Sequence, residues 1–314
     1  MKRRTGSQRL SIGVDLGGTG TRIALVGHPD GTLVTSRATA TAQIGARGGH
    51  AAIADLADTI RQTIEGHGPV ACIGIGASGP VNPATGIIDN PHTLPWFTGI
   101  PITGALAQEL DLPVTIDNDA VAAGLGEYTY GAAAGTTRAL AVTLGTGIGV
   151  ALVDHGRPFR GGDGSHPEAG HIPIADLGPP CYCGQRGCWE ALASRTALDQ
   201  ALAPHWPANT DTAARRAWLT RHAAEPAVAD VLARYGRHVG AGLASLQAVY
   251  QPQVTVLGGA AAEYLCHYAP AMEKAMHRNP PFTHAAPTVI GKLGDWAGAI
   301  GASLLATVTC SSPP

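Results

Sequence analysis

Residues 11–26 read Ser-Ile-Gly-Val-Asp-Leu-Gly-Gly-Thr-Gly-Thr-Arg-Ile-Ala-Leu-Val. Residues 11–16 alternate like a strand, a glycine-rich turn follows, and a second apolar run occupies 22–26. The stretch therefore predicts two strands joined by a tight turn. The pattern returns later in the chain, where apolar residues 139–144 and 150–153 flank Gly145-Thr146-Gly147-Ile148-Gly149. Two strand–turn–strand units of this kind indicate an internal duplication.

The rest of the chain mixes helical and strand periodicities. Apolar residues at helical spacing predict helices, and short apolar runs predict buried strands. The helices are expected at 50–64, 120–130 and 227–250, and the strands at 70–77, 113–116 and 253–257. A Pro- and Gly-rich loop is expected at 79–101. This order favours an α/β protein of two similar lobes with a cleft between them.

The composition excludes several classes of partner. The chain has 314 residues, of which 14% are charged, and a formal net charge of −2. This balance provides no electrostatic footprint for nucleic acid or for an anionic membrane. The basic residues at 2–4 are not followed by the apolar segment of a signal peptide. Uncharged stretches elsewhere are interrupted by Pro, Gly or polar residues, so we expect a cytoplasmic protein without a membrane span.

The two glycine turns are candidate phosphate-binding loops. Glycines allow backbone N–H groups to approach phosphate oxygens closely, threonine hydroxyls add donors, and Asp15 could hold the metal of a metal–nucleotide complex. A P-loop is excluded because the sole Gly-Lys pair, at 291–292, is followed by Leu293. A Rossmann fingerprint is excluded because the second turn leads into a strand. The alternative is two ordinary hairpins.

Asp117-Asn118-Asp119 follows a predicted strand, at the end where ligands bind in α/β domains. A carboxylate there could accept the proton of a substrate hydroxyl, and the asparagine amide could fix the substrate. Asn and Asp are also favoured helix N-caps, so capping remains the alternative.

Three cysteines and a histidine have the spacing of a metal site. Cys181, Cys183 and Cys188 form a Cys-x-Cys-x4-Cys loop, and His171 lies ten residues upstream of its first cysteine. Three thiolates and one imidazole would complete a tetrahedral structural zinc site, with free thiols as the alternative. The other cysteines, at 72, 266 and 310, lie among apolar residues and are expected in the core.

Taken together, these motifs resemble the ROK family of sugar kinases, over about residues 12–305. The resemblance rests on residues 15–22 and 144–149 as two phosphate motifs, Asn118-Asp119-Ala120 with Leu125-Gly126-Glu127, Glu168-Ala169-Gly170-His171, and the cysteine loop ending at Glu190. It implies a two-lobed actin/hexokinase-like (ribonuclease H-like) α/β fold with a duplicated core. Residues 1–118 would form a small N-terminal lobe, joined by a C-terminal helix at about 297–314. Residues 119–296 would form a larger lobe with a zinc loop at 171–190.

The resemblance also implies roles for individual residues. Asp119 would be the general base that takes the proton of a primary hydroxyl as its oxygen attacks the γ-phosphorus of ATP. His171 would have one ring nitrogen on a structural Zn2+ and the other facing the sugar, and Mg2+ would accompany ATP. The sugar ligands would be Gly79, Asn118, Asp119, Glu168, His171 and Glu190. The nucleotide side would comprise Asp15, Gly17, Gly18, Thr19, Thr21, Arg22, Thr143, Gly145, Thr146, Gly147, Gly258 and Gly259.

Departures from the family pattern concern the substrate. Ser78 stands where the family usually has Pro, Asn82 where it often has Asp, and His92-Thr93 where many members carry a sugar-contacting Asn; Pro167 replaces a Gly before Glu168, and Val150 a Gly of the second phosphate motif. Glucose is the default substrate. The alternatives are an aminosugar such as kanosamine, N-acetylmannosamine, fructose or a C7 cyclitol.

An alternative of another class is a non-catalytic sugar-sensing regulator. Only 14 residues precede Asp15, too few for a DNA-binding domain, so we expect the enzyme. Its expected partners are a small sugar and ATP, in a homodimer or homotetramer.

Overall fold

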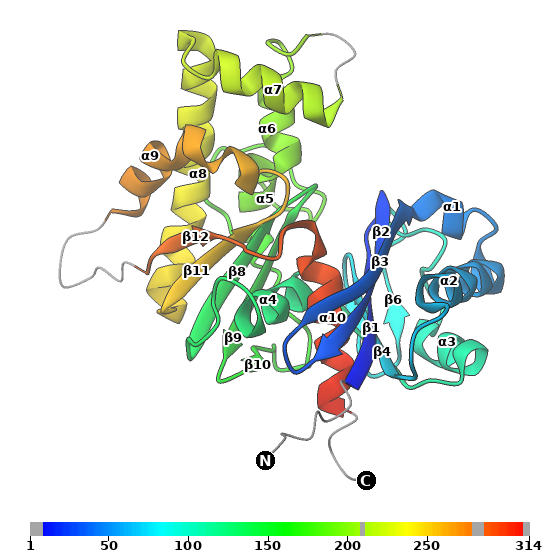
Figure 1. Ribbon diagram of the computed structural model, residues 1–314. Helices are drawn as coiled ribbons and strands as arrows, with labels where there is room; N and C mark the ends of the chain where they lie inside the picture. Colours follow the sequence, from blue (N-terminus) through cyan, green and yellow to red (C-terminus); the bar gives the residue numbers. More distant parts are fainter. Residues whose placement is uncertain (1–8, 208–210, 278–285, 310–314) are drawn as a thin grey trace. The chain divides into compact units, whose positions relative to one another are not determined.

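The computed structural model describes residues 9–207, 211–277 and 286–309 (Figure 1). The chain divides into two compact units. Unit 1 contains the described residues up to Thr137, together with Ala151–Pro167 and the described residues from Gly291 onward. Unit 2 contains Arg138–Val150 and Glu168–Ile290. Residues 119–137 thus lie in unit 1, whereas the boundary expected from the sequence follows residue 118.

Unit 1 is built on a five-stranded sheet with the order β3-β2-β1-β4-β7. Strand β1 (Arg9–Leu16) pairs antiparallel with β2 (Gly20–His28), and β2 pairs antiparallel with β3 (Thr32–Ala40). Strands β4 (Val70–Ala77) and β7 (Val114–Asn118) continue the sheet in parallel with β1. The first glycine turn therefore joins a true hairpin, as the alternation in residues 11–26 predicts.

The two faces of this sheet carry different helices (Figure 1). Ile12, Val14 and Leu16 belong to the apolar core shared with α2 (Gly49–Ile64) and α3 (Ile102–Leu110). The residues between them face the other side, where α4 (Asp119–Thr129) and α10 (Ala297–Thr309) pack. A Cβ on Gly13 would lie 1.7 Å from the carbonyl oxygen of Ala299. Glycine at this position allows α10 to contact the sheet backbone directly.

Unit 2 contains the parallel strands β8 (Arg138–Leu144), β11 (Val254–Gly258) and β12 (Thr288–Ile290). They belong to a sheet of order β10-β9-β8-β11-β12, and the division between the units passes through β9 (Ile148–Asp154). Between β10 and β11 the chain forms α5 (Trp189–Ala193), α6 (Arg195–Leu202), α7 (Thr212–His222) and α8 (Pro226–Tyr250), and between β11 and β12 it forms α9 (Leu265–Met276). The apolar face predicted for 227–250 is the buried face of α8, and it lies in the core of this unit.

The remaining described elements are short. They are α1 (Thr41–Gly45), β5 (Val81–Asn82), β6 (Ile87–Ile88), β10 (Arg157–Pro158), and the 3-10 turns Ala169–His171, Ala262–Tyr264 and Gly294–Trp296. The loop expected at 79–101 contains the β5–β6 hairpin and is anchored by the buried Leu94 and Phe97. None of the described helices combines the length and the apolar character needed to cross a bilayer.

Strand β3 and helix α3 are among the elements that the sequence analysis did not predict, and one burial expectation is wrong. Strand β3 is an edge strand with mostly exposed, polar residues, so it lacks the apolar alternation that marks a strand. Helix α3 is only nine residues long and follows a Pro-rich loop. Cys72 is buried as expected, but Cys266 is exposed because α9 buries Tyr268 and Met272 on another face. Cys310 lies outside the described residues.

Candidate active site

Asp119 is the first residue of α4, and strand register brings it beside Ser78. In the parallel pair β4–β7, Ala77 lies opposite Asn118, so the next residues of both strands are neighbours. The Ser78 hydroxyl donates to Oδ2 of Asp119 at 2.7 Å, and the Ala120 N–H donates to Oδ1 at 2.8 Å. Both oxygens of the candidate base are thus held in position. Ser78, which the sequence marked only as a departure from the family, is part of the site.

Asn118 fills the capping role that the sequence left open for this segment. Its Oδ1 accepts the N–H groups of Ala120 (2.9 Å) and Val121 (3.3 Å) at the start of α4. Its Nδ2 donates to the Gly79 carbonyl at 3.3 Å. Gly79 has φ of +88°, and a Cβ there would lie 2.4 Å from Nδ2 of Asn90, so only glycine fits. The cap fixes the Gly79 carbonyl and leaves the Asp119 carboxylate for another task.

Arg160 is a residue of this site that the sequence analysis missed. Its guanidinium forms a two-pronged contact with the buried carboxylate of Asp117: Nη1 lies 2.9 Å from Oδ1, and Nη2 contacts Oδ2. The same Oδ1 accepts the N–H of Asn118 at 2.8 Å. The pair therefore anchors the backbone immediately before Asn118 and Asp119. No local pattern connects residues 43 positions apart, which is why sequence reasoning did not find it.

The first glycine turn is closed by backbone contacts and by Thr41. The Gly17 N–H donates to the Gly20 carbonyl at 3.1 Å. The Thr41 hydroxyl donates to the Gly17 carbonyl at 2.5 Å, and its N–H donates to the Thr19 carbonyl at 3.1 Å. The Thr21 side chain is buried, and its hydroxyl lies 2.9 Å from that of Thr41. Thr21 thus supports the turn from inside, whereas Thr19 is exposed on it.

Asp15 lies at the end of β1, on the face covered by α10. A Cβ on Gly298 would lie 2.7 Å from its carboxyl carbon, so the start of α10 approaches this group closely. Desolvation and the negative charge of Asp119 raise the pKa of Asp15 to about 7, against the opposing charge of Arg22. The Arg22 guanidinium lies 3.8 Å from the Asp15 carboxylate and 3.7 Å from that of Asp295. Two carboxylates, Asp15 and Asp119, thus interact electrostatically in unit 1, an arrangement suited to a divalent cation.

The second glycine turn lies in unit 2 and is held by Glu190. The Gly145 N–H donates to the Gly147 carbonyl at 3.0 Å, and the Ile148 N–H donates to Oε2 of Glu190 at 2.8 Å. A Cβ on Gly147 would lie 2.2 Å from that oxygen, so the close approach requires glycine. The Thr143 hydroxyl donates to the Gly149 carbonyl at 3.3 Å, and Thr146 is exposed at the turn.

The Gly258-Gly259 motif reaches the same turn. Gly259 has φ of +78°, and a Cβ there would lie 2.7 Å from backbone atoms of Leu144. The Ala261 N–H donates to the Leu144 carbonyl at 3.0 Å. The structure therefore brings together Thr143, Gly145, Thr146, Gly147, Glu190, Gly258 and Gly259, as one set of neighbours in unit 2.

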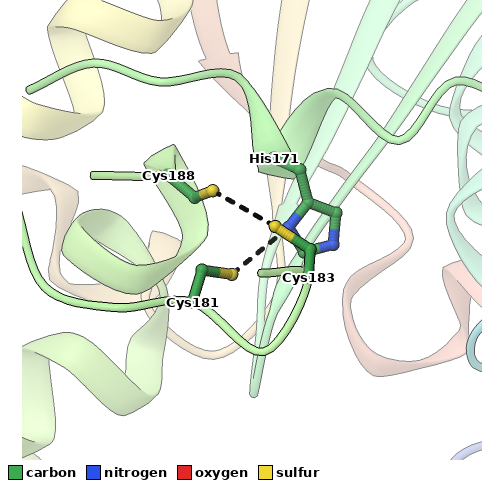
Figure 2. A group of neighbouring side chains, drawn as sticks. All are labelled: His171, Cys181, Cys183 and Cys188. Atoms are coloured by element: carbon green, nitrogen blue, oxygen red, sulfur yellow. Dashed lines mark hydrogen bonds between the residues drawn. The ribbon is translucent and has the colours of Figure 1, made fainter. Parts of the chain in front are cut away.

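The cysteine loop and His171 converge on one point (Figure 2). Cys181 Sγ lies 3.5 Å from His171 Nδ1, Cys183 Sγ lies 3.6 Å from Cys188 Sγ, and the four candidate ligand atoms all lie within 4.8 Å of one another. A tetrahedral zinc ion with bonds of about 2.3 Å holds its ligand atoms about 3.8 Å apart. The spacing therefore fits a four-coordinate metal ion. Burial, helped by the neighbouring sulfur atoms, raises the pKa of Cys188 to about 12, so a bound cation would be needed to stabilise its thiolate.

Unit 2 supports this cluster with rigid packing. Trp189, directly after Cys188, is fully buried; its Nε1 donates to the His238 carbonyl at 3.0 Å, and a Cβ on Gly242 would collide with its ring. On the other side, a Cβ on Gly170 would lie 2.5 Å from the Ile148 carbonyl oxygen. The loop is thus fixed between α8 and the second glycine turn.

His171 places its two ring nitrogens in different environments. Nδ1 faces the cysteine cluster, and Nε2 faces the Tyr182 hydroxyl at 3.1 Å. Glu168, exposed, precedes the 3-10 turn that carries His171, and the His171 N–H donates to its carbonyl at 3.0 Å. Tyr182 is a second residue that the sequence analysis missed. A hydroxyl-bearing ring between two candidate ligands, Cys181 and Cys183, was the available signal.

The chain is similar to known proteins along nearly its whole length. The model of the ROK family matches residues 11–308. The glucokinase of Thermotoga maritima is 32% identical over 93% of this chain and 95% of its own length. Two solved structures superpose closely. The ROK hexokinase from Thermus thermophilus, 33% identical, has a TM-score of 0.82 and coverage of 96% of this chain and 99% of its own. The ROK family glucokinase from Streptomyces griseus, in complex with glucose and AMPPNP, is 28% identical, with a TM-score of 0.81 and coverage of 95% and 99%. These similarities confirm the fold class expected from the sequence.

Proposed function

The chain belongs to the ROK family, and from that premise we propose that it is an ATP-dependent kinase of the primary hydroxyl of a hexose, with glucose as the default substrate. The observation that carries the proposal is the Asp119 carboxylate, presented at the end of β7 with both oxygens held by hydrogen bonds. A fixed carboxylate at the end of a parallel strand is suited to accept a hydroxyl proton. The similarity to a glucokinase crystallised with glucose and AMPPNP supports the choice of substrates.

The proposed reaction assigns one task to each group. The hydroxyl oxygen of the sugar attacks the γ-phosphorus of ATP, the bond from that phosphorus to the bridging oxygen breaks, and Asp119 takes the hydroxyl proton. The products are the sugar phosphate and ADP. Because phosphoryl transfer depends on positioning and charge stabilisation, the other residues act by binding. Gly79, Asn118, Glu168, His171 and Glu190 would bind sugar hydroxyls.

The nucleotide would be bound by backbone groups and by a cation. Asp15 would hold the Mg2+ that accompanies ATP, and Arg22 lies beside it. The two glycine turns would direct N–H groups at the phosphates, through Gly17, Gly18, Thr19, Gly145, Thr146 and Gly147, and Gly258-Gly259 would lie on the adenosine side. The lysine scarcity of the chain, three in 314 residues, leaves this work to amides and metal.

We propose zinc as the ion held by His171, Cys181, Cys183 and Cys188. With four protein ligands the ion would have no open position for water, so it would contribute structure and not a nucleophile. By fixing Nδ1 of His171, it would also fix the orientation of the ring and leave Nε2 available to a sugar hydroxyl.

The test is an ADP-release assay coupled to a chromophore, with Mg·ATP and a panel of glucose, mannose, fructose, N-acetylmannosamine, kanosamine and a C7 cyclitol. Wild type is compared with Asp119→Asn, which keeps an oxygen for the Ser78 hydroxyl but cannot act as base. We expect turnover on at least one hexose and a loss of about 10²- to 10⁴-fold in kcat for the variant. Sugar binding by calorimetry should persist in Asp119→Asn. Sugar binding without ADP release in the wild type would refute the kinase and favour a regulator.

A further inference from the structure

Tyr182 contacts the ring nitrogen of His171 that the proposed function reserves for the sugar. Its hydroxyl lies 3.1 Å from Nε2, and the two rings meet edge to face, with centroids 5.1 Å apart and planes at 87°. Resting on the proposed function, we propose that Tyr182 is a specificity-determining residue, whose hydroxyl occupies the place of a sugar hydroxyl and is displaced when the sugar binds.

The chemistry of this contact is that of a sugar hydroxyl. When Nδ1 of a neutral imidazole bonds a metal ion, its remaining proton lies on Nε2, which then donates. The group opposite Nε2 must therefore accept from the ring. The Tyr182 hydroxyl does so at 3.1 Å, as an alcohol of a hexose would. A sugar hydroxyl can therefore replace it without leaving the ring N–H unsatisfied.

The ring itself is free to leave. Tyr182 is 80% exposed, so its displacement sacrifices little packing beyond the contact with His171. A bound sugar replaces the hydrogen bond between Tyr182 and His171 with one of its own. Its affinity is therefore lower than it would be if Nε2 of His171 had no partner in the sugar-free protein. A deoxy sugar that lacks the hydroxyl facing His171 can bind while Tyr182 keeps its contact with Nε2. The tyrosine therefore also weakens discrimination against that deoxy sugar.

The test compares sugar binding to wild type and to Tyr182→Phe by calorimetry, with protein as purified and no nucleotide. The control is Tyr128→Phe, since the Tyr128 hydroxyl makes a long contact of 3.5 Å, to the Thr137 carbonyl in unit 1. The probes are glucose and its 1-, 2-, 3- and 4-deoxy analogues. We expect Tyr182→Phe to bind glucose about two- to tenfold more tightly, and one analogue to show no such gain. Metal analysis should give equal zinc in all three proteins.

Unchanged or weaker glucose binding in Tyr182→Phe would overturn the proposal, and a loss of affinity would make the hydroxyl a direct sugar ligand. A readout without sugar is the ¹⁵N resonance of His171 Nε2. It should differ between sugar-free wild type and Tyr182→Phe, and identical resonances would overturn the contact itself. These outcomes are separate from the fate of the proposed function. If the wild type released no ADP with any sugar, the proposed kinase activity would be refuted. Calorimetric sugar binding and the ¹⁵N resonance of His171 would still test the role of Tyr182.

Discussion

Replacing Arg160 with alanine should destabilise unit 1 and impair the site together. Asp117 is 4% exposed, and the Arg160 guanidinium contacts both of its carboxylate oxygens. Removing the guanidinium would leave a buried carboxylate without its cation, which typically costs about 3 to 5 kcal/mol. With an unfolding entropy of about 2.1 cal/mol/K per residue, that loss corresponds to a Tm lower by about 5 to 8 °C for 314 residues.

The same substitution should also lower kcat, because Asp117 anchors the backbone next to Asn118 and the proposed base, Asp119. Its Oδ1 accepts the Asn118 N–H at 2.8 Å, and Asp119 follows directly. A displacement of about 1 Å at the base would lower kcat by about 10²-fold. The assays are thermal unfolding by circular dichroism and the ADP-release assay at saturating sugar and ATP.

Three further variants make the interpretation specific. Arg157→Ala, an exposed arginine in the same segment, should change neither property. Arg160→Lys keeps the charge but not the two-pronged geometry, and should fall between wild type and Arg160→Ala. Adding Asp117→Asn to Arg160→Ala removes the buried negative charge that no longer has a cation beside it. The double variant should therefore recover much of the decrease in Tm. A Tm of Arg160→Ala within about 1 °C of wild type, or no recovery of Tm on adding Asp117→Asn, would contradict the anchoring role of the Arg160–Asp117 pair.

Three other predictions concern single groups. The folded protein holds a proton on Asp15 that the unfolded chain releases above its ordinary pKa of 3.8. The stability of the wild type should therefore fall as the pH rises from about 4 to about 7. Asp15→Asn should remove that loss and melt higher than wild type at pH 8 while abolishing turnover with Mg·ATP; parallel melting curves across this range would contradict it. Ser78→Ala removes the 2.7 Å bond to Asp119 and should lower kcat about tenfold with little change in the KM for sugar; a change in KM alone would assign Ser78 to sugar binding. Metal analysis should give about one zinc per chain, and Cys183→Ala should lose the metal and weaken sugar binding measured by calorimetry. A metal-free preparation with full sugar affinity would separate the cluster from the sugar site.

Local patterns were sufficient for the elements with a strong period. The helix expected at 50–64 is α2, the strand at 70–77 is β4, and the helix at 227–250 is α8, each within one residue of its predicted bounds. A segment with one buried face has apolar residues at a regular spacing, and a segment buried throughout is a continuous apolar run. Both patterns can be recognised in the sequence. Strand β3 was missed because an edge strand with an exposed surface carries no such period.

The sequence alone therefore predicted the first hairpin, the candidate ligand set of the cysteine and histidine cluster, and Asp119 as a candidate base. Each depends on residues close together in the chain, where spacing and chemistry can be read directly. Only the tertiary structure decided which side chains contact these residues and keep them in position. Ser78 reaches Asp119 across 41 residues and Arg160 reaches Asp117 across 43, through strand register and packing. Tyr182 lies among the predicted ligands, yet its bond to His171 depends on how the loop folds back, a consequence of three-dimensional packing that no spacing in the chain encodes.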